Sequence, residues 1–113
     1  MDTQKILIVS ERPLVYQGLK KIIQETMPKV SITVSGEQAV KQLVKELGPV
    51  VVLVDRASVE AARLDDLFSH LECAVKVIVI GSYDDQMLVY SRGMKQTANF
   101  ENLIRAISGK SEE

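Results

Sequence analysis

Three short runs of aliphatic residues constrain the fold of this chain more than any other feature. The runs are Lys5–Val9, Val50–Val54 and Val75–Ile80, and each is rich in β-branched side chains. Strands of this composition are buried on both faces, as they are in parallel sheets. Aromatic residues make up only 4% of the chain, so valine, isoleucine and leucine must build the core. The runs predict an α/β fold, an open parallel sheet covered by helices on both sides.

The segments between these runs carry the patterns of helices and of one further strand. Apolar residues recur at helical spacing over residues 14–23 and 40–47, and Pro13 suits the first turn of the earlier helix. Residues 30–34 alternate between apolar and polar side chains, which is typical of a strand at the edge of a sheet. A last helix is predicted over residues 100–107.

Residues 83–98 do not fit this alternation of strand and helix. Residues 87–90 are a continuous apolar run with the character of a strand, but a crossover helix between parallel strands needs about a dozen residues. Either that helix is cut to one or two turns, or it is absent and residues 86–91 form a strand directly after Ile80. The second arrangement, which we favour, makes residues 86–91 an antiparallel edge strand that follows a tight turn at residues 83–85.

Composition limits the classes of function that the chain can have. Its 113 residues predict a single domain over residues 1–113. The net charge of −1 does not supply the positive field that duplex DNA requires, so we expect no direct binding of nucleic acid by this domain. Cys73 is the only cysteine, which excludes a disulfide within the chain. No secretory signal and no apolar run long enough for a bilayer are present, so we expect a cytoplasmic protein without a membrane partner.

Polar side chains follow the predicted strands at the points where the strands end. Glu11 comes shortly after the first strand, Asp55 ends the third, and Gly81–Ser82 end the fourth. Sites in open parallel sheets form at these carboxyl ends, so Glu11 and Asp55 are expected to converge. Two such carboxylates favour a Mg²⁺ ion, with Asp55 as a nucleophile toward a phosphoryl donor. The alternative is structural: Asp55 caps the sheet, and Glu11 lies in solvent beside a helix N-terminus.

Three segments resemble a known family. They read KILIVSERPLVYQGLKKII at 5–23, SGEQAVKQLVKELGPVVVLVD at 35–55 and VKVIVIGSYDD at 75–85. In these segments the chain resembles the receiver domain of bacterial two-component response regulators, and most closely the receivers that precede a helix-turn-helix output domain. The resemblance implies a flavodoxin-like three-layer sandwich with sheet order 2-1-3-4-5. Here we expect its fourth helix to be shortened or missing, and in the second arrangement described above residues 86–91 form an antiparallel edge strand.

The resemblance also implies roles for particular residues. Asp55 corresponds to the phosphorylated aspartate, and the metal ligands are Glu11, Asp55 and the backbone carbonyl of Ala57. The family has two adjacent acidic residues where this chain has Ser10 and Glu11, and the extra methylene of Glu11 is expected to lower the affinity for Mg²⁺.

The groups that sense the phosphoryl group are altered more strongly. The family's switch threonine or serine aligns with Gly81, and Ser82 is the next hydroxyl along the chain. The family's conserved lysine has Lys95 as its nearest equivalent by spacing. A phosphoryl group on Asp55 would therefore lack the charge-assisted hydrogen bonds that its dense negative charge requires.

We therefore expect an atypical receiver, or pseudo-receiver, in two-component signal transduction, a phosphorelay system. It is expected to act by phosphorylation-independent protein contact or dimerisation, and to regulate transcription through an attached output domain. The expected partners are a histidine kinase or output domain and a second copy bound through residues 86–107. We expect no enzymatic activity, because the sequence has no glycine-rich phosphate loop and no catalytic triad. The alternative is a phosphorylation-competent receiver that accepts a phosphoryl group on Asp55 with Mg²⁺.

Overall fold

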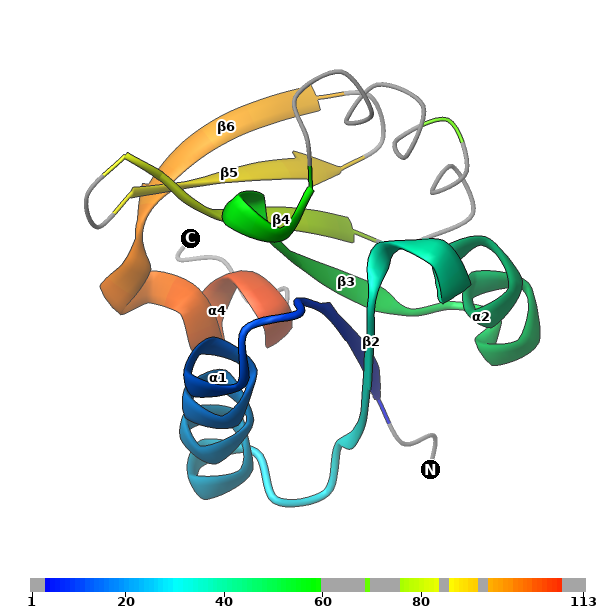
Figure 1. The fold of residues 1–113 in the computed structure, drawn as a ribbon. Coiled ribbons are helices and arrows are strands. Elements are labelled where there is room, and N and C mark those ends of the chain that lie inside the picture. The colour runs from blue at the N-terminus through cyan, green and yellow to red at the C-terminus, as the bar shows by residue number, and fades with distance from the viewer. Residues whose placement is uncertain (1–3, 60–68, 70–75, 84–85, 92–93, 109–113) are drawn as a thin grey trace.

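The aliphatic runs form the centre of a six-stranded sheet (Figure 1). The structure is a computed structural model that describes residues 4–59, 69, 76–83, 86–91 and 94–108. In order across the sheet, the strands are β2 (Ser31–Ser35), β1 (Lys5–Val9), β3 (Val51–Asp55), β4 (Lys76–Tyr83), β5 (Gln86–Ser91) and β6 (Met94–Asn99).

The sheet is parallel on one side and antiparallel on the other. β1 pairs in parallel with both β2 and β3, and β3 pairs in parallel with β4. β5 runs antiparallel to β4, and only residues 84–85 separate the two strands along the chain. The predicted antiparallel strand at residues 86–91 is therefore confirmed, and no room remains for a fourth helix at this point.

The prediction that residues 86–91 form the edge of the sheet was wrong, because β6 pairs with β5 along its whole length. Residues 94–99 read MKQTAN and lack both β-branched enrichment and a clear apolar face, so no strand was predicted there. The antiparallel partner satisfies the outer main-chain groups of β5, which outweighs the weak local preference of β6.

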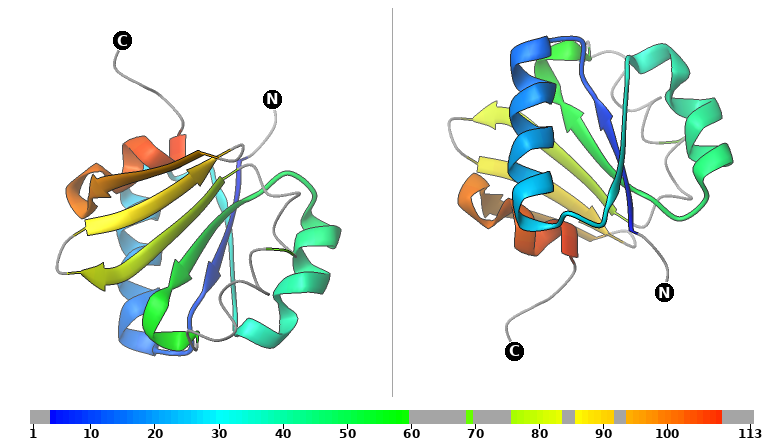
Figure 2. Two further views of the ribbon diagram at one scale, coloured as in Figure 1. Left: turned by 90° about the horizontal axis from the view of Figure 1, so that it is seen from above. Right: turned by 90° about the horizontal axis from the view of Figure 1, so that it is seen from below.

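Helices cover both faces of the sheet (Figure 2). α2 (Val40–Leu47) packs on one face, where its Val40 and Val44 meet side chains such as Leu7 and Val9 of β1. α1 (Pro13–Thr26) and α4 (Leu103–Ser108) pack on the other face, against Ile6, Ile8 and their neighbours. Successive strand residues point to opposite faces, so each aliphatic run supplies two separate clusters of the core.

Short 3₁₀ turns connect some of these elements: η1 (Glu37–Ala39), η2 (Arg56–Ser58) and η3 (Phe100–Asn102). The predicted last helix therefore begins as a 3₁₀ turn and continues as α4. Pro13 does occupy the first turn of α1, as predicted. Among the described residues, the arrangement is a three-layer mixed α/β fold. Its sheet order begins 2-1-3-4-5, but the sixth strand makes the complete order unspecific for the flavodoxin-like fold.

The amino ends of the strands are tied to the last turns of two helices. The Lys5 ammonium donates to the carbonyl of Leu47 over 2.8 Å, and the Lys76 ammonium donates to the carbonyl of Ala106 over 2.6 Å. Carbonyl groups in the last turn of a helix have no partner within the helix and carry partial negative charge, so a lysine stabilises them. The opposite rim of the sheet, where β1 and β3 end, is left for Asp55 and its neighbours.

In the part of the chain that the structure describes, no helix is both long and apolar enough to cross a membrane.

Candidate functional site

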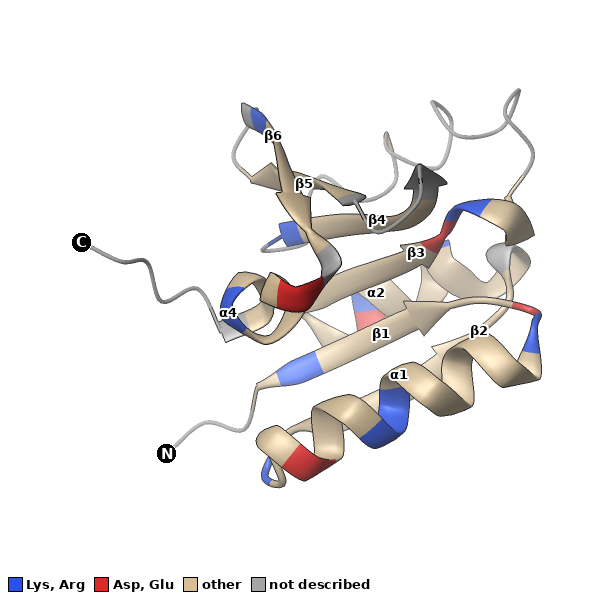
Figure 3. Ribbon diagram, turned by 90° about the vertical axis from the view of Figure 1, so that its left-hand side faces the viewer, with Lys and Arg blue, Asp and Glu red and all other residues tan. Residues whose placement is uncertain are grey.

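Asp55 is the last residue of the central strand β3, and its side chain is only 1% exposed. Ser10, which directly follows β1, is the other buried polar residue recorded in the described part of the chain. Figure 3 shows acidic positions followed directly by basic positions where β1 and β3 end. The carboxyl ends of these neighbouring parallel strands therefore hold a charged cluster around a buried carboxylate.

Five hydrogen bonds satisfy the two oxygens of Asp55. Oδ1 accepts from Arg12 Nη2 over 2.6 Å and from the backbone N–H of Ala57 over 3.3 Å. Oδ2 accepts from Arg12 Nε over 2.8 Å, from the Ser10 hydroxyl over 2.9 Å and from the Ser58 hydroxyl over 3.0 Å. The guanidinium thus binds both carboxylate oxygens at once, which is the strongest geometry for such a pair.

The two serine hydroxyls also receive hydrogen bonds from the backbone after β1. The N–H of Glu11 donates to the Ser58 hydroxyl over 2.9 Å, and the N–H of Arg12 donates to the Ser10 hydroxyl over 3.2 Å. Each hydroxyl therefore accepts from the β1–α1 loop and donates to Asp55. Hydrogen bonds in such chains polarise one another and strengthen the network, which joins the β1–α1 loop to η2.

The surroundings of Asp55 shift its pKa in opposite directions. Burial raises the pKa of this carboxyl, while hydrogen bonds from Arg12, Ser10 and Ser58 and the positive charge of Arg12 lower it. The net result is a pKa below the usual value, so Asp55 is ionised at neutral pH. The hydrogen bond to Asp55 raises the pKa of Arg12 in return, although the Arg12 side chain is 51% exposed.

Glu11 reaches the same rim as Asp55, but its carboxylate is directed elsewhere. A Cβ atom added at Gly36 would lie 2.9 Å from Glu11 Oε2, which places the carboxylate against the residue that follows β2. The residue itself is exposed. The structure therefore brings the backbones of both predicted ligands together at one rim, while Arg12 rather than Glu11 faces the Asp55 oxygens.

The residues present do not fit the divalent metal ion that the resemblance implies. No group of three or more histidine, cysteine or acidic side chains suited to a metal occurs among the described residues. Mg²⁺ requires oxygen ligands in near-octahedral geometry, whereas the Asp55 oxygens already accept five hydrogen bonds. Ala57, predicted to offer its carbonyl, enters the site through its N–H. A metal ion would have to displace the guanidinium of Arg12.

The position that corresponds to the family's switch hydroxyl does lie beside Asp55, but it is a glycine. A Cβ atom on Gly81 would be 3.9 Å from Asp55 Oδ1, and the φ of Gly81 is +93°. Residues other than glycine rarely adopt a backbone conformation with a positive φ. Gly81 lies where the pairing of β4 with β5 shifts its register, between Ile80 and Tyr83. Ser82 has its backbone in β4, and its side chain lies outside what the structure describes.

Lys95 lies far from Asp55. It is exposed near the start of β6. Across the sheet, Lys95 pairs with Tyr90 and Tyr90 pairs with Val77, whereas Asp55 pairs with Ile80, three residues further along β4. Three strand spacings and three residues separate the two side chains, about 14 Å across the sheet and about 10 Å along it. The predicted phosphate-sensing role of Lys95 is therefore not supported, because β6 begins at the opposite rim of the sheet.

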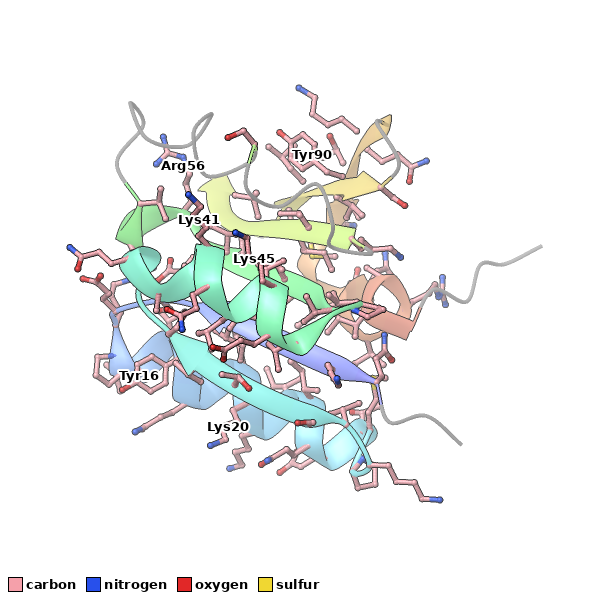
Figure 4. All side chains as sticks on the ribbon, turned by 90° about the vertical axis from the view of Figure 1, so that its right-hand side faces the viewer. Tyr16, Lys20, Lys41, Lys45, Arg56 and Tyr90 are labelled. Carbon is pink, nitrogen blue, oxygen red and sulfur yellow. The ribbon has the colours of Figure 1, made fainter. Side chains whose placement is uncertain are left out.

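The sequence analysis did not predict that Arg12 belongs to the site. The sequence does contain a pattern that points to it. Where receiver domains have two adjacent acidic residues, this chain has Ser10 and Glu11, and the basic residue Arg12 follows directly. A buried carboxylate requires a cation or hydrogen-bond donors nearby, and Arg12 is the basic residue closest along the chain to the end of β1. Figure 4 labels three further basic residues, Lys20 on α1 and Lys41 and Lys45 on α2. All three lysines are exposed.

Comparisons with known proteins add no assignment, because no family model, no curated protein and no solved structure matches the chain. A carboxylate that is buried, ionised and fully hydrogen-bonded is suited to holding two loops together, and its oxygens are poorly available for attack on a phosphoryl group.

Proposed function

We propose that this chain is an atypical receiver-like module of two-component signal transduction, which acts through protein contact rather than phosphoryl transfer. The observation that carries the proposal is the bidentate ion pair between Arg12 and Asp55. An aspartate at the end of a central parallel strand is retained, while the space around its oxygens is filled by a side chain of the same domain.

The fold supports the receiver-like assignment. Read from β2, the first five strands follow the order expected for a flavodoxin-like sheet, and helices lie on both faces. Asp55 ends β3 at the rim where such sheets bind ligands.

The surroundings of Asp55 argue against efficient phosphoryl transfer. A nucleophilic oxygen must approach phosphorus in line with the leaving group, and cations must neutralise the charge that develops. Both oxygens of Asp55 are engaged by donors, Lys95 lies at the other rim, and Gly81 has no hydroxyl to bind the product.

The proposed partner surface lies within residues 86–107, which include β5, β6 and most of α4. In the described part of the chain β6 pairs on one side only, with β5. An edge strand of this kind offers unpaired main-chain groups to another chain. We propose that a second copy binds here, and that a histidine kinase or an attached output domain that controls transcription is the further partner.

Intact-mass spectrometry tests the absence of phosphoryl transfer. The native protein and the Asp55→Asn variant are incubated with acetyl phosphate and Mg²⁺ under identical conditions. We expect no phosphoryl adduct on either protein. An adduct on the native protein that the variant lacks would establish the phosphorylation-competent alternative instead.

A further inference from the structure

We propose that Arg12 is the resident cation of this site, a guanidinium that the chain supplies in place of a divalent metal ion. The inference deepens the proposed function and rests on it for the comparison with a metal-binding receiver. The group that neutralises Asp55 should affect the stability of the protein and the effect of Mg²⁺ on that stability. Phosphorylation of Asp55 tests the proposed function instead.

The burial of Asp55 creates the need for a cation. Its side chain is 1% exposed, and removing an ionised carboxylate from water is costly unless charge and hydrogen bonds compensate. Two hydroxyls and one backbone N–H contact the oxygens, but none of them carries a charge. Arg12 supplies the positive charge, at 2.6 Å from Oδ1.

The local backbone holds Arg12 in the position that this contact requires. Arg12 is the N-cap of α1 in an extended conformation, and its carbonyl accepts hydrogen bonds from the N–H groups of Val15 and Tyr16. Its own N–H donates to the Ser10 hydroxyl, and Pro13 follows in the first turn of the helix. The side chain therefore starts from a fixed point beside Asp55, and its planar fork loses less conformational freedom for each hydrogen bond formed than a lysine side chain would.

A tethered cation excludes a free one. Because Arg12 belongs to the same chain, its effective concentration at Asp55 is high, and a dissolved ion must displace it to bind. The native protein is therefore expected to be insensitive to Mg²⁺. Removal of the guanidinium should leave a buried anion that either a metal ion or a change of Asp55 to a neutral side chain would relieve.

Thermal unfolding of a set of variants, with and without MgCl₂, tests the inference. Arg12→Ala should lower the melting temperature by about 5–10 °C, less than the loss expected for a fully buried ion pair, because half of the Arg12 side chain is exposed to solvent. Adding Asp55→Asn to Arg12→Ala should raise the melting temperature again, because the amide needs no cation. MgCl₂ should raise the melting temperature of Arg12→Ala and leave the native protein and the double variant unchanged.

Arg56→Ala is the matched control. Arg56 directly follows Asp55, but its Nη1 donates to the carbonyl of Val59, so the same change of charge occurs without loss of the pair. Neither Asp55→Asn nor MgCl₂ should improve the stability of this variant. Arg12→Lys, which keeps the charge without the fork, should melt between Arg12→Ala and the native protein.

The order of stabilities decides the matter. The inference is overturned if the double variant melts at or below Arg12→Ala, or if MgCl₂ stabilises the native protein as much as it stabilises Arg12→Ala. If Arg12→Ala does not fold, folding of the double variant supports the inference and its failure to fold overturns it. Phosphoryl labelling of native Asp55 would contradict the proposed function while leaving this order of stabilities intact.

Discussion

Asp55 combines burial with complete hydrogen bonding, and the two together suit it to holding the β1–α1 loop and η2 together. The position of Asp55 at the end of an aliphatic strand was enough to predict that it lies at the same sheet rim as Glu11, but not that the Glu11 carboxylate is directed toward Gly36. The partner could not be predicted in the same way, because the direction of the Arg12 side chain depends on how α1 begins and on the space left by Ser10. Side-chain direction after a strand is set by tertiary packing, which residue spacing does not encode.

The pKa of Asp55 predicts how stability depends on pH. Its folded-state pKa lies below the ordinary value of 3.8, so the unfolded chain binds the proton more readily than the folded chain does. The stabilisation is therefore complete above the ordinary pKa and is lost as pH falls through the lowered folded value. Urea unfolding of the native protein from about pH 2 to 6 should show this loss.

Asp55→Asn serves as the comparison for the pH measurement, because it removes the titrating group from the same position. The free energy of unfolding of the variant should fall less steeply with acid than that of the native protein. Parallel profiles for the two proteins would show that Asp55 does not titrate with a lowered pKa.

Gly81 should resist substitution because of its backbone. Gly81→Ala places a side chain at a φ of +93°, and we expect a loss of about 1 kcal/mol in the free energy of unfolding. Gly36→Ala is the control, since the three atoms nearest to its new Cβ would all belong to the exposed side chain of Glu11, which can move, and the change should stay within about 0.5 kcal/mol. Equal effects in chemical denaturation would contradict this reading of the β4 irregularity.

The helices and strands were predictable wherever hydrophobic period and length agreed. The aliphatic runs became β1, β3 and β4, the alternating segment became the edge strand β2, and Pro13 began α1. β6 escaped prediction because its partner in the sheet, rather than its own sequence, makes it a strand. Its neighbour β5 had the local apolar pattern, and pairing with β5 then fixed the polar segment that follows.

One helix position offers a test of local propensity against packing. Gly18 lies within α1, and a Cβ atom added there would have nothing within 4 Å. Gly18→Ala should therefore stabilise the protein by about 1 kcal/mol in chemical denaturation. Gly48→Ala, at the end of α2 where φ is +75°, should destabilise it by a similar amount. Destabilisation by Gly18→Ala would show that this face of α1 is packed against something.

For the whole molecule, the two edges of the sheet differ in ways that bear on assembly. β2 is the outermost strand at one edge, next to β1, and β6 is the outermost strand at the other edge, next to β5. Thr97 of β6 and Ser31 of β2 are both exposed, so each edge can be altered without disturbing the core. Proposed self-association through residues 86–107 predicts that only the β6 edge matters.

Size-exclusion chromatography with light scattering tests this assignment of the dimer surface. The native protein should give the mass of a dimer at high concentration. Thr97→Lys should shift it to a monomer, because lysine on an edge strand discourages pairing, while Ser31→Lys should leave the dimer intact. A native protein that stays monomeric, or equal effects of the two variants, would refute the assignment.

In the proposed function, Arg12 holds Asp55, and Asp55 accepts no phosphoryl group. Intact-mass spectrometry after treatment with acetyl phosphate and Mg²⁺ measures this most directly, at the level of a single covalent bond. The native protein should keep its unmodified mass throughout the time course. A phosphoryl group that accumulates on the native protein and is absent from Asp55→Asn would contradict it.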